Sequence, residues 1–215
     1  MKKLSIVISI LIVSVTTINA QLEDINPEYL KTLQERSKNI VDGMQLLDNE
    51  KAARVEEIIV IHYYQLSKIH DARDNDLKAI SHLEGEEKEA AKESIATDTD
   101  AKLYKLHAVF LASLSAELSQ AEVEMVKDGM TYGVVKHTFT GYLNLLPDLN
   151  DEQKRYIYKN LVEAREFAMD AGSSKAKHAW FGKYKGRINN YLSAQGIDMK
   201  KAEEELKQRQ AEKKD

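Results

Sequence analysis

The sequence predicts an all-α protein, a single-domain bundle of about five or six helices arranged as antiparallel hairpins. Helix breakers are rare, because the 215 residues include only two prolines and nine glycines. Alanine, glutamate, lysine and leucine, which favour helices, are abundant. Apolar residues also recur at steps of three and four along most of the chain, which is the spacing of one buried helix face.

The first twenty residues predict export. Lys2 and Lys3 precede an apolar run over residues 4–15, and a short polar stretch then ends at Ala20. A basic start, an apolar run too short to span a bilayer and a small residue are typical of a secretory signal peptide. We therefore expect residues 1–20 to be removed after Ala20 and the protein to be periplasmic or secreted.

Composition limits the chemistry that the exported chain can carry. The sequence has no cysteine, so disulfides and thiolate metal sites are excluded. The formal charge of −4 becomes about −6 once Lys2 and Lys3 are removed, with 29 basic residues against 35 acidic ones. Such an acidic protein lacks the basic footprint of a nucleic-acid-binding protein. No apolar run after the first one is long enough to cross a membrane.

The first half of the chain predicts two helices and a connection. The first helix should begin with Asn26 as its N-cap and Pro27 at the first helical position, and end at Gly43. A long amphipathic helix is expected over residues 48–80. The polar stretch 85–100 is interpreted as a charged helical turn or loop that joins two antiparallel helices.

The middle of the chain predicts one strong helix and one weaker one. An apolar stripe over residues 103–125 predicts a helix that ends near Gly129. Residues 131–146 are a weaker candidate, because β-branched and aromatic residues are frequent there. Pro147 should end this second helix.

Capping residues mark the helices that follow. Asn150 with Gln153 forms a capping-box pair, and the helix that it starts should stop near Gly172. Ser173 or the serine after it should cap a further helix that ends at Gly196.

The last residues differ from the rest in composition. We expect the helical domain to span residues 21–198 and a charged segment to span residues 199–215. Asp198 is a suitable N-cap for this segment, in which Leu206 is the one large aliphatic residue and opposite charges are spaced four apart. These features are typical of a solvated, fraying helix or tail.

Residues 175–191, here called the basic aromatic segment, are the leading candidate for a binding site. They hold the one tryptophan of the chain, and no acidic residue occurs between Asp170 and Asp198. Aromatic rings can stack on sugars, arginine and asparagine can bond hydroxyls or a carboxylate, and lysines attract an acidic ligand such as a uronate. The candidate ligand-binding residues are Lys177, His178, Trp180, Tyr184, Lys185, Arg187, Asn189, Asn190 and Tyr191.

The basic aromatic segment also has a purely structural interpretation. Trp180, Tyr184, Ile188 and Tyr191 fall on one helical stripe, as residues that face a core do. The lysines would then form the solvated face, and two glycines spaced four apart would let a neighbouring helix approach closely.

No catalytic residue, metal site or cofactor is predicted. The six histidines show no metal-ligand spacing, and His62 and His107 lie on apolar stripes where hydrogen-bonded core histidines are expected. Phosphate-binding loops, dinucleotide-binding loops and hydrolase elbows are absent from the sequence. Glu163, Glu166 and Asp170 form an acidic stripe that suits a solvated face, ion pairs with the following basic helix or, less simply, acid–base catalysis.

Several motifs together carry a family resemblance. Residues 180–192 read W-F-G-K-Y-K-G-R-I-N-N-Y-L, and they are flanked by Gly172-Ser173-Ser174 and Gly196-Ile197-Asp198. With residues 127–133 and 164–166, this pattern resembles a family of small secreted Bacteroidetes proteins of unknown function. That family carries a sugar-binding label, and its genes often lie in polysaccharide-utilisation clusters. The resemblance implies an exported, non-enzymatic accessory protein that binds an oligosaccharide or polysaccharide, including acidic polysaccharide.

Two other functions stay open. Residues 149–153 are similar to the L-T-x-x-Q motif of periplasmic helical stress chaperones of the Spy and CpxP type, with Asn150 in the place of threonine. That similarity implies a chaperone or envelope-stress protein that holds unfolded clients. The third function is a polysaccharide-processing enzyme that uses Glu163, Glu166 or His178.

Overall fold

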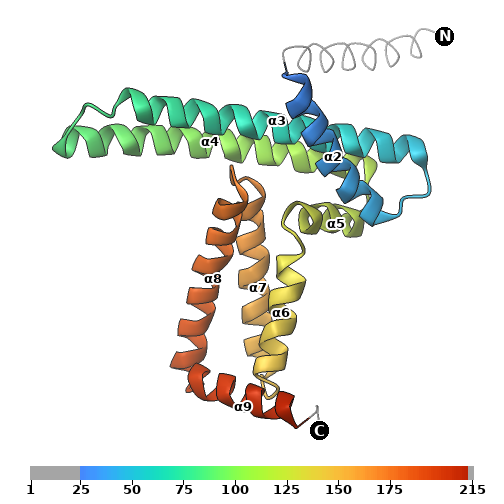
Figure 1. The fold of residues 1–215 in the computed structure, drawn as a ribbon, viewed down its shortest axis with the longest axis vertical. Helices are drawn as coiled ribbons and strands as arrows, with labels where there is room; N and C mark the ends of the chain where they lie inside the picture. Colours follow the sequence, from blue (N-terminus) through green and yellow to red (C-terminus); the bar gives the residue numbers. More distant parts are fainter. Residues whose placement is uncertain (1–24, 213–215) are drawn as a thin grey trace. The chain divides into compact units, whose positions relative to one another are not determined.

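The computed structural model describes residues 25–212, and all regular structure in this part of the chain is helical (Figure 1). The all-α prediction is confirmed, whereas the expected five or six helices are too few, since the described residues form eight. The predicted signal peptide lies outside the described residues. The chain divides into two compact units, residues 1–65 and residues 66–215.

The described part of the first unit contains helix α2, Pro27–Met44, and the start of helix α3, Asn49–Ala79. The Asn26 side chain accepts hydrogen bonds from the two backbone N–H groups that open α2, as its position as N-cap predicts. The helix ends in a left-handed C-cap at Gln45, close to the predicted stop at Gly43. Its buried side chains recur at helical spacing and are Leu33, Ser37, Val41 and Met44.

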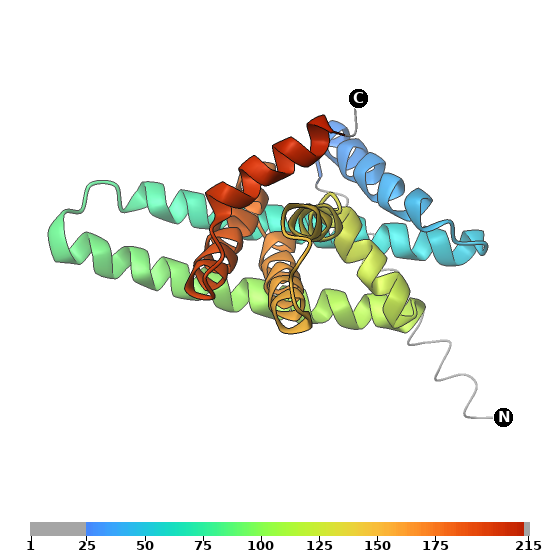
Figure 2. The same ribbon diagram turned by 90° about the horizontal axis from the view of Figure 1, so that it is seen from below.

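The second unit begins with residues 66–79 of α3, which run antiparallel to the start of helix α4, Gly85–Glu117 (Figures 1 and 2). The stretch 85–100 was expected to be a charged helical turn or loop that joins two antiparallel helices. It is helical, but it is the first half of α4 and not the connection. After Gly85 no glycine or proline interrupts this helix, and ion pairs such as Lys92–Glu89, at 2.7 Å, support its polar surface.

A break divides the apolar stripe that the sequence presents over residues 103–125. Ser119 starts helix α5, Gln120–Met130, through a capping box with Glu122. Helix α6, Val134–Leu145, follows and confirms the weaker of the two predicted helices. The capping geometry of Ser119 therefore overrides the continuous apolar pattern.

Helices α7, Asp151–Met169, α8, Ser174–Ala194, and α9, Met199–Ala211, complete the unit. Their predicted caps at Asn150, Ser173 and Asp198 are all present. Helices α7 and α8 form an antiparallel pair, α6 lies beside α7, and α9 crosses to the end of α6 (Figures 1 and 2).

Helices α6 to α9 share a hydrophobic core. Helix α7 contributes a fully buried stripe at helical spacing, and α8 contributes a facing one. Helix α9 is held against α6 because Arg209 donates hydrogen bonds to the carbonyl oxygens of Asn144 and Leu145, each at 3.1 Å. The fully buried members are Ile157, Leu161, Ala164, Ala168, Ile188 and Leu192.

Across residues 25–212, no helix combines the length and the apolarity that crossing a bilayer requires.

Candidate functional site

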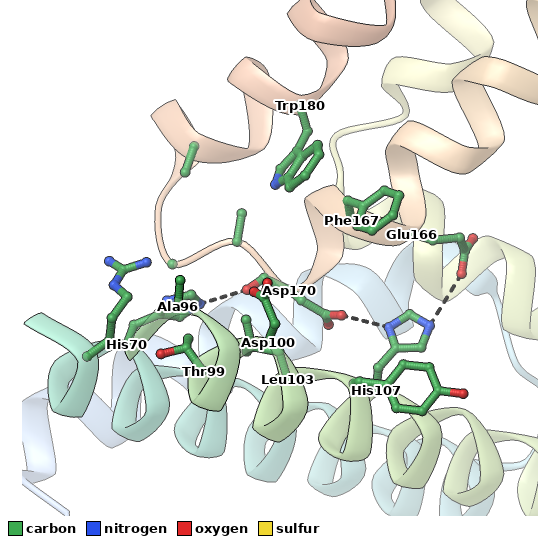
Figure 3. A pocket seen from close by; sticks show the side chains of 15 residues that line it. His70, Ala96, Thr99, Asp100, Leu103, His107, Glu166, Phe167, Asp170 and Trp180 are labelled. Carbon is green, nitrogen blue, oxygen red and sulfur yellow. Dashed lines mark hydrogen bonds and ion pairs between the residues drawn. The ribbon is translucent and has the colours of Figure 1, made fainter. Parts of the chain in front are cut away.

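A pocket of about 700 Å³ lies within the second unit, where the end of α7 and the start of α8 meet α3 and α4 (Figure 3). One wall comes from a single face of α4, because Asp100, Tyr104 and His107 are spaced by four and three residues. The opposite wall carries the aromatic side chains Phe167 and Trp180. The pocket therefore places hydrogen-bonding groups opposite two rings.

His107 joins α4 to the C-terminal end of α7. Its Nδ1 lies 2.8 Å from Asp170 Oδ2, and its Nε2 lies 3.5 Å from Glu166 Oε2 (Figure 3). The hydrogen bonds with Asp170 and then Glu166 raise the pKa of His107 to about 9, although burial acts to lower it. At neutral pH the ring is therefore a cation between two carboxylates.

Ion pairs continue from Glu166 into α5. Lys127 Nζ lies 3.0 Å from Glu166 Oε2. Burial acts to raise the pKa of Glu166, but hydrogen bonds with His107 and Lys127, together with nearby positive charges, lower it to about 2. This carboxylate is consequently ionised and already occupied by protein partners.

Arg165 is the most buried cation of this group, with 2 % of its surface exposed. Its guanidinium donates to Asp128 Oδ1 at 2.6 Å and to a carboxylate oxygen of Glu124. We use the term charge network for Arg165 with its acidic partners Glu124 and Asp128, together with Lys127, Glu166, His107 and Asp170. This network fixes α4 and α5 against the C-terminal half of α7.

The last carbonyl oxygens of α7 also receive side-chain hydrogen bonds. Lys177 Nζ lies 3.1 and 2.9 Å from two of them, and His70 Nε2 lies 2.7 Å from the carbonyl oxygen of Asp170. A carbonyl oxygen only accepts, so Nε2 of His70 carries the proton. Its buried Nδ1 has no hydrogen-bond partner among the described residues, a condition that is uncommon outside functional sites.

Gly172 lies directly against the His70 ring. A Cβ atom added at Gly172 would lie 2.8 Å from Cγ of His70, closer than real Cβ contacts allow. The turn between α7 and α8 therefore depends on glycine for the close approach that completes the pocket.

The aromatic wall is a stacked pair. The rings of Phe167 and Trp180 have centroids 4.7 Å apart and planes 18° apart, and Lys183 Nζ lies 4.8 Å from the Trp180 ring. Phe167 is 46 % exposed, which is high for a large apolar side chain. Within residues 25–212, no partner occupies the indole N–H of Trp180 or the hydroxyl of Tyr104.

Trp180 is the one member of the nine candidate ligand-binding residues that lines this pocket. Tyr184 donates to Glu163 at 2.9 Å, and Arg187 contacts the same carboxylate at 3.4 Å and lies over the Tyr184 ring. Glu163 of the acidic stripe thus pairs with the following basic helix, whereas Glu166 and Asp170 pair with residues of α4 and α5.

Other candidate residues also contact neighbouring helices. Tyr191 stacks on Tyr156 with centroids 3.7 Å apart. Asn189 accepts a 2.6 Å hydrogen bond from the hydroxyl of Tyr142. Burial raises the pKa of Tyr142 to about 12, so the phenol stays protonated and can donate this bond. Lys177 of α8 is buried against the C-terminal end of α7, where it donates to the last carbonyl oxygens of that helix.

The remaining three candidates are exposed. His178 stacks on Tyr132 with centroids 5.9 Å apart, and Lys185 and Asn190 face solvent. The structure therefore distributes the basic aromatic segment over several faces of α8. Lys183 lies over the Trp180 ring, but none of the candidate cations or asparagines lines the pocket beside it.

The pocket residues that the sequence did not indicate are His70, Asp100, Tyr104 and Phe167. Asp100, Tyr104 and His107 do share a helical face, but the stretch before residue 100 shows no clear helical pattern of apolar residues. His70 and Asp170 are one hundred residues apart, and only the folded chain brings them together.

Within the described residues, no three histidine, aspartate or glutamate side chains lie close enough together to hold a metal ion. The residues considered for catalysis are also dispersed. Glu166 lines the pocket, whereas Glu163 pairs with Arg187 and His178 stacks on Tyr132.

Comparison with protein families gives one match. The model of a family described as a protein of unknown function, DUF3826, matches residues 30–211. None of the curated proteins compared with the chain is similar to it. The expected similarity to an uncharacterised family is confirmed, while the implied sugar binding and bacterial group stay predictions.

Proposed function

This chain belongs to the DUF3826 family, and we propose that it is an exported, non-enzymatic accessory protein that binds carbohydrate in the pocket beside Trp180. The observation that carries the proposal is the pairing of an exposed aromatic wall with a polar helix face. Phe167 and Trp180 form the first, and Asp100 and Tyr104 belong to the second.

This combination suits the two surfaces of a sugar. The C–H groups of a sugar ring pack on aromatic carbon, while its hydroxyl groups need donors and acceptors. Trp180 supplies both an apolar ring and an N–H donor, Tyr104 supplies a hydroxyl, and Asp100 supplies acceptors. A volume of about 700 Å³ lies within the range of small-ligand sites and accommodates one or two sugar units.

The charge network supports the same proposal by holding the pocket in shape. His107 and its two carboxylates connect the two walls, so that α4 and the end of α7 keep a fixed separation. A preformed site loses less conformational entropy on binding than one that must be ordered first.

Calorimetry after a glycan-array screen tests the proposal. The wild-type protein should bind at least one oligosaccharide, and Trp180→Ala should weaken that binding tenfold or more. Tyr158→Ala is the matched control, because Tyr158 is 49 % exposed on α7 but lies outside the pocket lining. If the wild type binds no glycan, or if both variants lose equal affinity, carbohydrate binding in this pocket is excluded.

The chaperone and enzyme alternatives receive less support from the described residues. A client-holding chaperone needs a continuous exposed apolar face. The large exposed apolar side chains of the described residues include Leu77, Val109, Met125 and Phe167, which lie on four different helices. Suppression of aggregation of a heat-denatured client would favour the chaperone, and turnover of pectic substrates that Glu166→Gln abolishes would favour the enzyme.

A further inference from the structure

We infer that the sugar unit bound in this pocket is electrically neutral, and that Asp100 sets this preference against uronates. The inference rests on the proposed function, because it names the ligand class of the same site. It departs from the preference for acidic sugars that the lysines of the basic aromatic segment suggested. The evidence is the way in which the charged groups around the pocket are paired.

The cations that line the pocket are already paired with carboxylates. His107 lies between Asp170 and Glu166, at 2.8 and 3.5 Å. Arg73 holds Asp74 through two of its nitrogens, at 3.0 and 2.7 Å. A uronate carboxylate would therefore meet cations whose charge is already offset by protein carboxylates.

The cations of the basic aromatic segment do not compensate for this arrangement. Lys177 donates to the carbonyl oxygens at the end of α7, and Arg187 pairs with Glu163, which does not line the pocket. Lys183 lies over the Trp180 ring rather than among the residues that line the pocket. Neither Arg187 nor any of the lysines of α8 therefore lines the pocket.

In contrast to these cations, Asp100 is a negatively charged residue of the pocket that has no charged partner among the described residues. It lines the pocket and is exposed, and none of the described residues forms a hydrogen bond or an ion pair with it. An ionised carboxylate accepts hydrogen bonds from neighbouring hydroxyl groups, and those bonds are stronger than bonds between neutral groups. The same charge repels a ligand carboxylate, which also has no proton to donate.

The remaining polar groups complement a neutral sugar. The indole N–H of Trp180 donates, and the hydroxyl of Tyr104 both donates and accepts. With the acceptors of Asp100, the pocket can bond hydroxyl groups in both directions without leaving a ligand charge unpaired.

The experiment compares oligosaccharides that differ only in their carboxylates. Calorimetry at low and high salt would use equal-length gluco-, galacto- and manno-oligosaccharides and the corresponding uronates. For wild type, we expect at least one neutral member to bind tenfold or more tightly than its uronate, with the gap narrowing at high salt. Asp100→Asn should reduce the gap to threefold or less, mainly by strengthening uronate binding.

Asp98→Asn is the matched control. Asp98 is an exposed aspartate of α4 that pairs with Lys102 at 2.5 Å and does not line the pocket, so the wild-type preference should persist. Uronates that bind as tightly as neutral sugars would overturn this inference and leave carbohydrate binding intact. A preference that Asp100→Asn leaves unchanged would overturn the role of Asp100, and an absence of all glycan binding would overturn the proposed function as well.

Discussion

Helix α7 is held in place by different forces along its apolar face and at its C-terminal end. Ile157, Leu161, Ala164 and Ala168 are fully buried in the apolar core shared with α6, α8 and α9. Toward its C-terminal end, Arg165, Glu166 and Asp170 join the charge network. Apolar packing is non-directional, whereas ion pairs and hydrogen bonds fix distances and angles. The pocket lies at the end of the helix where directional contacts set the geometry.

The comparison also shows why buried charge does not simply mean stability. Removing a guanidinium from water costs several kcal/mol, and its partners largely offset this cost. An apolar core stabilises without such a penalty. We interpret the charge network as a device that positions the pocket walls, while the apolar core supplies most of the stability.

Removing the acids that neutralise Arg165 should have the largest effect. In Glu124→Gln with Asp128→Asn, the amide oxygens can still accept hydrogen bonds, but among the described residues the buried cation keeps one ionic contact, at 3.3 Å to Glu166. The free energy of unfolding should therefore fall by about 3–5 kcal/mol. Urea denaturation followed by circular dichroism measures this loss. The control Arg165→Met removes the buried charge itself and should cost less than half as much, and an equal cost would contradict the positional interpretation.

Truncating a side chain of the apolar core should lower the free energy of unfolding by a comparable or slightly smaller amount, but with a different dependence on salt. Leu161→Ala creates a cavity at a fully buried site, and we expect the free energy of unfolding to fall by about 2–5 kcal/mol. This loss should be the same at low and high salt, because no charge is involved. A strong salt dependence of the Leu161→Ala effect would show that the apolar core and the charge network are not independent.

Raising the pH should weaken the charge network selectively. The pKa of His107 is raised from 6.5 to about 9 on folding. Its stabilising contribution is therefore fully present below about pH 6.5 and is lost as the pH rises through about 9. Between these two pH values, the free energy of unfolding of the wild type should fall by on the order of 1–2 kcal/mol relative to that of His107→Gln, after allowance for partial solvent screening. Unfolding curves at several pH values would show this, and parallel profiles for the two proteins would refute it.

The exposed ion pair between Arg187 and Glu163 should matter least. Both side chains are nearly half exposed and lie 3.4 Å apart, so Arg187→Ala should change the free energy of unfolding by about 1 kcal/mol or less. Sugar binding should also be unaffected, because Arg187 does not line the pocket. Loss of binding in this variant would instead place the site around Arg187 in the basic aromatic segment, as the sequence predicted.

The success of the sequence-based predictions varies with the range of the interactions involved. Asn26, Asn150 and Asp198 were identified as helix caps and act as caps, because capping involves groups only two or three residues apart. The stretch 85–100 was misjudged, since its helix lacks an apolar stripe and is supported by charged pairs and by its continuation into the rest of α4. The break at Ser119 was missed for the opposite reason, because the apolar pattern continues across it.

The residues of the candidate site also differ in whether the sequence indicated them. Trp180 was identified because a single tryptophan in a basic segment is conspicuous in the sequence. His70, Asp100 and Phe167 were not, because none belongs to a local motif, and their significance arises from contacts between distant helices. The aromatic and basic composition of α8 is visible in the sequence, whereas the partner of each side chain is not.

By itself, the sequence determined that the described chain is helical and where most of its helices begin and end, because propensity, capping and periodicity act over a few residues. The folded structure was needed to show which charges neutralise one another and that Trp180 lines a pocket. These outcomes depend on contacts across up to one hundred residues, such as that between His70 and Asp170. No local pattern encodes such contacts, since the entropy of closing so long a loop is offset only by the packing of the whole unit.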